Sequence, residues 1–121
     1  MKQTKIDIGN SWEDYVSKYI VKGGYIIVDK NFYSQYGEID IVAFKDGILV
    51  FFEVRYRSSG LISCIESLNY NKKIRLIKTA NIYLSKNPTY QNNPIQFDFV
   101  AIGKTGKKYN LVHFKNCIQD S

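Results

Sequence analysis

An Asp-Gly pair at positions 46 and 47 constrains the fold of this chain more than any other feature, because it separates two runs of strand-like sequence. Asp-Gly is among the strongest signals for a two-residue type I′ turn between antiparallel strands. That turn pairs Lys45 with Ile48 and so fixes the register of the residues on either side. A four-residue loop gives the same register, whereas a three-residue loop shifts it by one position and requires a bulge. Residues 38–44 and 48–56 are therefore predicted to form a hairpin.

The predicted register sets two pairs of charged residues side by side on one face of the hairpin. Asp40 lies opposite Glu53, and Glu38 lies opposite Arg55. Side chains alternate between the two faces of a strand, so the other face carries a uniformly apolar set. That set is Ile39, Ile41, Ala43, Val50, Phe52 and Val54. This face is predicted to be core, and it supports the register independently of the turn.

Two carboxylates placed directly opposite each other repel, since the Cβ atoms of such a pair lie about 4.5–5.5 Å apart. A divalent cation between Asp40 and Glu53 would compensate the repulsion, and Mg²⁺ prefers oxygen ligands of this kind. The residues alone thus make Asp40 and Glu53 candidate metal ligands. The alternative is an exposed sheet edge where water solvates both carboxylates, with Arg55 and Lys45 nearby as compensating charges.

The remaining sequence predicts a mixed α/β (α+β) architecture. Helices are expected at 11–23, with Ser11 as the N-cap, and after 58–60, with an interruption near 69–71. Further strands are expected at 25–28, 95–102 and 109–115. The resulting order α-β-β-β-α-β-β indicates a mixed five-stranded sheet flanked by helices. No linker or repeat divides the chain, so residues 1–121 are expected to form a single domain.

The charge balance favours a polyanionic partner. The chain has 17 Lys and Arg against 11 Asp and Glu, a formal net charge of +6, and basic domains of this kind often bind nucleic acid. Candidate phosphate contacts are Lys72, Lys73, Arg75, Lys78 and Arg57. Each of them could instead be an ordinary solvated side chain on a charged face.

The chain is expected to reside in the cytoplasm. It has no apolar run near the roughly 20 residues that a membrane-spanning helix needs, and no secretory signal follows its basic start. Cys64 and Cys117 fit no zinc-site spacing and are expected to be reduced.

Two short segments around the hairpin carry a recognisable pattern. Gly37-Glu38-Ile39-Asp40 followed by Glu53-Val54-Arg55 resembles the signature of PD-(D/E)xK nucleases, and the surrounding sequence resembles the YraN-type uncharacterised family of that superfamily. Further matching positions are spread over nearly the whole chain: Gly24, Tyr25, Asn31, Phe51, Phe52, Lys73, Ala80, Asp98 and His113. The resemblance implies a restriction-endonuclease-like core similar to Holliday-junction resolvases, with Mg²⁺ chemistry and a nucleic-acid substrate.

The resemblance also implies roles for individual residues. Asp40 and Glu53 would bind Mg²⁺ or Mn²⁺, with Glu13 as a third acid presented from the first helix and the Val54 carbonyl as a further oxygen ligand. Arg55 occupies the position where the superfamily has lysine. Arginine stays charged, so it can stabilise developing negative charge but cannot act as a neutral base.

Two of the acids have alternative roles. Glu13 could instead be an acid placed favourably in the first turn of a helix. Glu38 could pair with Arg55 or order water near the cation rather than bind it.

These residues predict a Mg²⁺-dependent endonuclease that hydrolyses phosphodiester bonds of DNA in preference to RNA, with branched or single-stranded DNA as candidate substrates. The candidate catalytic residues are Asp40, Glu53, Arg55, Glu13 and Glu38. One alternative is a weak or inactive nucleic-acid-binding module with a nuclease fold. Another is an interaction domain whose charge serves solubility. The oligomeric state stays open, a homodimer included.

Overall fold

The computed structural model describes the backbone of residues 5–118 and the side chains of residues 11–118. The elements are the helix α1 (Lys5–Lys22), the strands β1 (Ile26–Ser34), β2 (Gly37–Lys45) and β3 (Ile48–Arg57), the helices α2 (Leu61–Glu66) and α3 (Tyr70–Lys86), a 3₁₀ turn η1 (Pro88–Tyr90), and the strands β4 (Ile95–Thr105) and β5 (Lys108–Phe114). This order confirms the mixed α+β prediction, with the second helical stretch divided as expected. Residues 1–4, which belong to the basic start of the chain where no secretory signal is expected, lie outside the described part.

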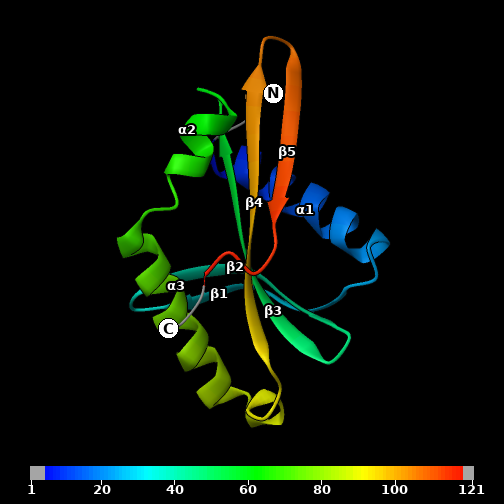
Figure 1. Ribbon diagram of the computed structural model, residues 1–121, viewed down its shortest axis with the longest axis vertical. Coiled ribbons are helices and arrows are strands. Elements are labelled where there is room, and N and C mark those ends of the chain that lie inside the picture. The colour runs from blue at the N-terminus through cyan, green and yellow to red at the C-terminus, as the bar shows by residue number, and fades with distance from the viewer. Residues whose placement is uncertain (1–4, 119–121) are drawn as a thin grey trace.

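The five strands form one mixed sheet in the order β1-β2-β3-β4-β5. Strand β3 pairs with β4 in parallel, and the other neighbours are antiparallel. The parallel pair needs a crossover, which α2 and α3 supply. The sheet is strongly twisted, so that β1 and β2 run across the view of Figure 1 while β4 and β5 run along it.

Both faces of the sheet are covered by helices (Figure 1). On one face, Val16 and Ile20 of α1 pack against a buried cluster that includes Ile41 and Phe52. On the other, the buried residues of α3 pack against those of β2, β3 and β4: Leu76, Ala80, Tyr83, Ile39, Val42, Leu49, Phe51 and Phe97. The hairpin therefore lies in the middle of the fold, with core on both sides.

The predicted hairpin register is confirmed from Lys45 paired with Ile48 as far as Ile41 paired with Phe52. One detail of the face assignment is wrong: Ile39 packs with the α3 cluster and not with Ile41 on the α1 side. The cause is that β2 leaves β3 beyond Ile41, while it stays paired with β1 as far as Gly37. Once the two strands are no longer paired, the alternation of side chains between the faces of a flat hairpin no longer predicts which core cluster a residue joins.

Helix α1 begins at Lys5, so the prediction of Ser11 as its N-cap is wrong. No proline interrupts the residues before Ser11, and serine costs little inside a helix compared with glycine or proline. Glu13 consequently lies more than two turns into the helix. The alternative in which Glu13 serves as a first-turn acid is therefore wrong as well.

Helix α2 is held against β4 by a close approach of the backbone. A Cβ atom on Gly103 would lie 2.1 Å from the amide nitrogen of Leu61, so only glycine fits there. Cys64 is the buried residue of α2, and both Cys64 and Cys117 are free thiols. Within the described residues, no helix is long and apolar enough to span a membrane.

Candidate metal centre

The candidate site lies where β2 and β3 separate. The backbone pairing of the two strands ends at Ile41 and Phe52. Beyond this pair, the Asp40 side chain bonds to β3 instead: its Oδ2 accepts a hydrogen bond from the Val54 N–H at 2.7 Å. The predicted direct pairing of Asp40 with Glu53 is therefore replaced by a fork between the strands. Strand β3 continues alongside β4 from Leu49 to Arg57, whereas β2 follows β1.

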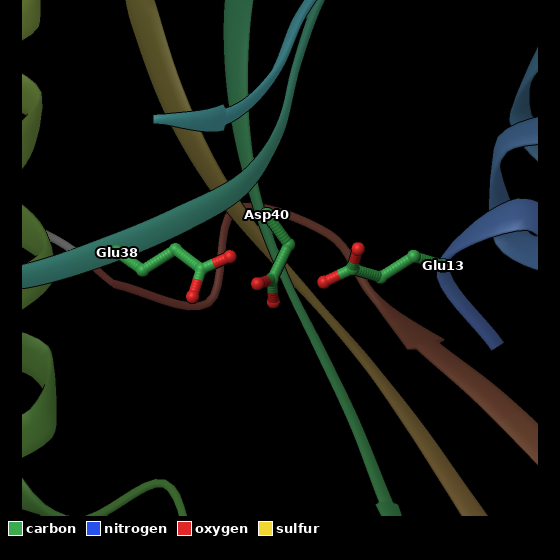
Figure 2. A group of neighbouring side chains, drawn as sticks. All are labelled: Glu13, Glu38 and Asp40. Atoms are coloured by element: carbon green, nitrogen blue, oxygen red, sulfur yellow. The ribbon is translucent and has the colours of Figure 1, made fainter. Parts of the chain in front are cut away.

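Three carboxylates converge at this fork. Figure 2 shows Glu13 reaching in from α1 while Glu38 and Asp40 point toward it from β2. One oxygen from each of the three lies within 4.8 Å of the others. Asp40 is 7% exposed, and Glu13 and Glu38 are partly buried. The alternative of two solvated carboxylates at a sheet edge is therefore wrong, because burial removes the water that would screen their repulsion.

Asn31 of β1 supports the acids from the neighbouring strand. Its backbone has a φ of 55°, a left-handed conformation that asparagine tolerates better than most residues. With its amide nitrogen turned toward the acids, Asn31 donates to Glu13 at 3.0 and 3.3 Å and to Glu38 Oε1 at 2.9 Å. The orientation follows from the surroundings, since the opposite one would place the amide oxygen against carboxylate oxygens. Asn31 thus holds two of the three acids together.

Burial and neighbouring charges raise the pKa values of two of these acids, Asp40 and Glu13. Burial, followed by the charge of Glu53, raises the pKa of Asp40 well above its usual range, and the hydrogen bond from Val54 opposes this only in part. Burial also raises the pKa of Glu13, where a hydrogen bond with Asp40 opposes the shift and Glu38 adds to it. Without a cation, the surroundings therefore disfavour the ionised forms of Asp40 and Glu13.

Glu53 of β3 lies on the other side of the fork, with its side chain 6% exposed. Its Oε1 accepts from Arg55 Nη2 at 3.1 Å and lies 3.6 Å from Lys72 Nζ of α3. Its Oε2 is buried and has no hydrogen-bond partner among the described residues. A buried carboxylate oxygen without a partner is costly and needs an explanation, such as an ion or a water molecule. The donor set, which consists only of oxygens, fits Mg²⁺ or Mn²⁺.

Two predicted contacts differ from the structure. Arg55 pairs with Glu53 and not with Glu38, because Glu38 turns toward Asp40 and Glu13 after β2 leaves β3. Lys72, expected on an exposed basic face, is only about a quarter exposed and faces Glu53. Its position follows from α3, whose Asn69 N-cap accepts from the Lys72 N–H and sets the first turn of the helix beside β3.

The other predicted phosphate contacts lie outside the fork. Lys78 lies over the Tyr36 ring at 4.9 Å, Arg75 is exposed, and Lys73 is partly buried. Arg57 donates to the Tyr56 carbonyl at 3.0 Å. The structure therefore brings the carboxylates of Glu13, Glu38 and Asp40 together. It places Glu53, with Arg55 and Lys72, close enough to Asp40 for its charge to act there. The other predicted cations lie outside this group.

Sequence reasoning did not assign a role to Asn31. The available signal was an asparagine within a strand-like segment, since asparagine is depleted in strands and enriched at positive φ. The position of Lys72 had no comparable signal, because the contact depends on how α3 packs against β3.

The fold and the site together define a class: an α+β domain with a mixed five-stranded sheet and a carboxylate centre at a fork between two central strands. Within that class, the chain belongs to the uncharacterised protein family UPF0102, whose family model matches residues 12–102. The matched segment contains all four acids of the fork. The family resemblance drawn from the sequence is confirmed.

Relatives from distant bacteria match over most of their length. A UPF0102 protein of Sulfurimonas denitrificans is 37% identical over 108 residues, covering 89% of this chain and 93% of the relative. One from Vibrio parahaemolyticus is 34% identical over 110 residues, covering 90% and 91%. One from Francisella tularensis subsp. tularensis is 40% identical over 102 residues, covering 83% and 87%. The similarity thus extends over most of this chain and most of each relative.

Proposed function

We propose that the protein is a divalent-metal-dependent phosphodiesterase that cleaves nucleic acid, DNA in preference to RNA. The observation that carries the proposal is the unpartnered, buried Oε2 of Glu53 beside a fork where three further carboxylates meet. A single acidic cluster is common on protein surfaces. A buried carboxylate oxygen without a partner, next to a second buried acid whose pKa its charge raises, is not.

Asp40, Glu53 and Glu13 are the residues that would hold Mg²⁺ or Mn²⁺. Glu38, which faces them, would bind the same ion or hold its water. The Val54 carbonyl is a further candidate, since the N–H and C=O of a strand residue point to the same side and the Val54 N–H points at Asp40. When bound, the cation would lower the pKa of a water molecule and neutralise negative charge on the phosphate.

The protein's own residues would supply the remaining chemistry. Asp40 and Glu13, whose pKa values burial raises, would hold a cation in their deprotonated forms. Arg55 and Lys72 neutralise Oε1 of Glu53 and leave Oε2 free for the ion. Both cations lie at the rim of the fork, where they would stabilise charge that develops on a phosphate. Arg55 stays protonated throughout, so its role is electrostatic.

The charge of the molecule supports a nucleic-acid substrate. Four of the 11 acidic residues gather at the fork, so the rest of the surface is more basic than the net charge of +6 suggests. A cationic surface around an acidic centre attracts a phosphate backbone and lets a bound cation meet it. Arg57, Lys73, Arg75 and Lys78 are the proposed backbone contacts.

The test compares cleavage of single-stranded and branched DNA by the wild type, Asp40→Asn and Glu53→Gln in Mg²⁺ or Mn²⁺. The proposal predicts cleavage that EDTA abolishes and that each variant reduces by at least about 100-fold, as expected when a group that stabilises the transition state is lost. Glu66→Gln is the matched control, because Glu66 is an exposed acid of α2. Equal activity in all four proteins would overturn the proposal.

Arginine at position 55 favours one second candidate function, a nucleic-acid-binding module without turnover. Without a lysine at position 55, the site lacks an amine at that position that could accept a proton. Such a module would bind DNA in the presence of EDTA. Its affinity would fall as the salt concentration rises, by about 0.9 log unit per phosphate contact for each tenfold increase. Cleavage by the wild type excludes it.

A further inference from the structure

Aromatic side chains gather along the seam between α1 and β5, outside the metal centre. The ring of Trp12 stacks on Tyr56 with centroids 5.5 Å apart, and its centroid lies 5.7 Å from Tyr15 and 5.1 Å from Tyr109 of β5. Tyr15 is 57% exposed and Tyr109 is 53% exposed. The inner rings complete the core beneath α1, but the two outer rings stand open to solvent. An exposed aromatic group of this kind indicates a surface that binds something.

The same seam continues to the other end of α1. Tyr19, which is 41% exposed, lies edge-on to His113 of β5 with ring centroids 5.9 Å apart. The buried Asp98 carboxylate fixes the orientation of the His113 ring, since it lies 2.7 Å from Nε2. Burial raises the pKa of Asp98, but hydrogen bonds from His113, Asn116 and Gln96 outweigh it and hold the pKa below its usual value. Asp98 is therefore ionised, Nε2 carries the proton, and Nδ1 faces the Tyr19 hydroxyl at 3.4 Å.

Helix α1 and strand β5 therefore meet through two pairs of aromatic rings, with α1 running across the view of Figure 1 and β5 along it. Trp12 meets Tyr109 near one end of the seam, and Tyr19 meets His113 near the other. Tyr19 follows Trp12 by seven positions, which corresponds to roughly 10 Å of helix at 1.5 Å per residue.

Lysines stand at both ends of the seam. Lys104 lies over the Tyr109 ring at 5.8 Å. At the Tyr19 end is an open pocket of about 270 Å³, lined in part by Tyr19, Tyr25, His113, Lys22, Lys45 and Lys115. Lys45 donates to the Gly23 carbonyl at 2.7 Å, whereas Lys22 and Lys115 form no ion pair with any residue from 11 to 118. An apolar floor with free cations at its edge complements a group that is both flat and anionic.

We propose that the α1–β5 seam binds an unpaired nucleic-acid strand, with bases stacked on Tyr15, Tyr109 and Tyr19 and phosphates at Lys104, Lys22 and Lys115. Single-stranded nucleic acid is bound by rings that stack on bases beside cations that follow the backbone. A duplex cannot use such a surface, because its base faces are hidden. The inference rests on the proposed function and names its substrate. Trp12 and Glu13 are neighbours in α1, so the seam and the metal centre share this helix.

The test uses the fluorescence of Trp12, the only tryptophan in the chain, in the presence of EDTA so that no cleavage occurs. The probes are a short oligothymidylate, a mixed-sequence duplex of the same length, and thymidine monophosphate. The oligothymidylate should change the fluorescence at concentrations at least tenfold lower than either other probe. Tyr15→Ala and Tyr109→Ala should each weaken its binding by roughly 5- to 150-fold, the effect of losing one stacked base.

Conservative variants and a matched control complete the experiment. Tyr15→Phe and Tyr109→Phe keep the rings and should bind as the wild type does. Tyr70→Ala removes a still more exposed tyrosine from α3, where it is 74% exposed, and should leave binding unchanged. Three results would each overturn the proposal: alanine variants no weaker than Tyr70→Ala, duplex binding as tight as single-strand binding, or saturation by the mononucleotide alone.

The result is separate from the test of the proposed function. Binding here is measured without metal and without turnover. Single-strand binding at the seam in a protein that takes up no metal would overturn the phosphodiesterase proposal and leave the seam in place. Metal-dependent cleavage without a fluorescence response would do the reverse.

Discussion

Asp40 Oδ2 accepts the Val54 N–H at 2.7 Å at the point where β2 and β3 cease to pair. A side-chain carboxylate thus replaces the backbone carbonyl that a continuous ladder would have supplied. This hydrogen bond satisfies Val54 and places Asp40 within the sheet, 7% exposed, beside Glu53. The fork and the acidic centre are therefore one structural feature, and the predictions below test it.

Asp40→Asn is expected to raise the melting temperature of the metal-free protein. An asparagine oxygen can still accept from the Val54 N–H, while the charge that burial and Glu53 disfavour is removed. Each kcal/mol relieved corresponds to about 3–6 °C in a domain of this size. The same variant should lose the further rise that Mn²⁺ gives the wild type. Thermal melts in EDTA and in Mn²⁺ measure both effects; a lower melting temperature in EDTA with the Mn²⁺ response intact would remove Asp40 from the ligand set.

The metal-free protein is expected to lose stability as the pH rises. The pKa values of Asp40 and Glu13 are raised in the folded state, so the fold binds more protons than the unfolded chain between the unfolded and folded pKa values. Their favourable contribution is complete below the unfolded pKa, near 4, and is lost as the pH climbs through the raised folded values. Asp98 acts in the opposite sense: its lowered pKa stabilises the fold above the unfolded pKa, a contribution lost only in acid.

Denaturant melts in EDTA from pH 5 to pH 8 check this dependence. The wild type should lose stability across the range, and the double variant Asp40→Asn with Glu13→Gln should lose less. Saturating Mn²⁺ should abolish or reverse the trend, because the cation binds the deprotonated carboxylates. Parallel slopes for the wild type and the double variant would contradict the account.

Much of the hairpin could be predicted from the sequence, because the turn and the apolar face of β2 and β3 are local signals. The turn at Asp46-Gly47 and the alternation around it set the register correctly from Lys45 to Ile41. The separation of β2 from β3 could not be predicted, because it depends on a competition between strand pairings. Beyond Ile41, the pairing of β2 with β1 and of β3 with β4 prevails over the pairing of β2 with β3. The burial of Asp40 and Glu53, and the turn of Glu38 away from Arg55, are consequences of that competition.

The rest of the site depends on contacts between segments far apart in the sequence. Glu13 reaches Asp40 only because α1 crosses the sheet beside the fork. Lys72 reaches Glu53 only because α3 packs its first turn against β3. The pairing of two strands carries no information on where a helix will lie, so these contacts between the predicted acids and the helices could not be predicted from the hairpin.

Arg55→Lys is expected to preserve or increase cleavage. Lysine keeps a positive charge beside Glu53 and adds an amine that can release a proton, which arginine cannot do. Arg57→Lys is the matched control, since Arg57 donates to the Tyr56 carbonyl and does not contact the described acids. Steady-state cleavage rates in Mn²⁺ measure the effect. A large loss in Arg55→Lys, with Arg57→Lys unchanged, would show that the planar guanidinium itself is required.

Lys72→Met is expected to tighten the binding of Mn²⁺ while it slows cleavage. The Lys72 ammonium lies 3.6 Å from Glu53 Oε1 and repels a second cation at the same carboxylate. Removing one such partly exposed charge should change metal affinity by roughly 2- to 10-fold. Lys73→Met, which removes the neighbouring charge, is the control. Calorimetric titrations with Mn²⁺ compare the affinities of the two variants. Weaker Mn²⁺ binding in Lys72→Met would contradict the prediction and show that the lysine serves to order the site.

Isothermal titration calorimetry with Mn²⁺ tests the central claim most directly, with the wild type, Asp40→Asn, Glu53→Gln and the exposed-acid control Glu66→Gln titrated side by side. The account predicts one Mn²⁺ per chain in the wild type and in Glu66→Gln, and at least a tenfold loss of affinity in each of the two fork variants. Mn²⁺ uptake of equal affinity in all four proteins, or none in the wild type, would contradict it.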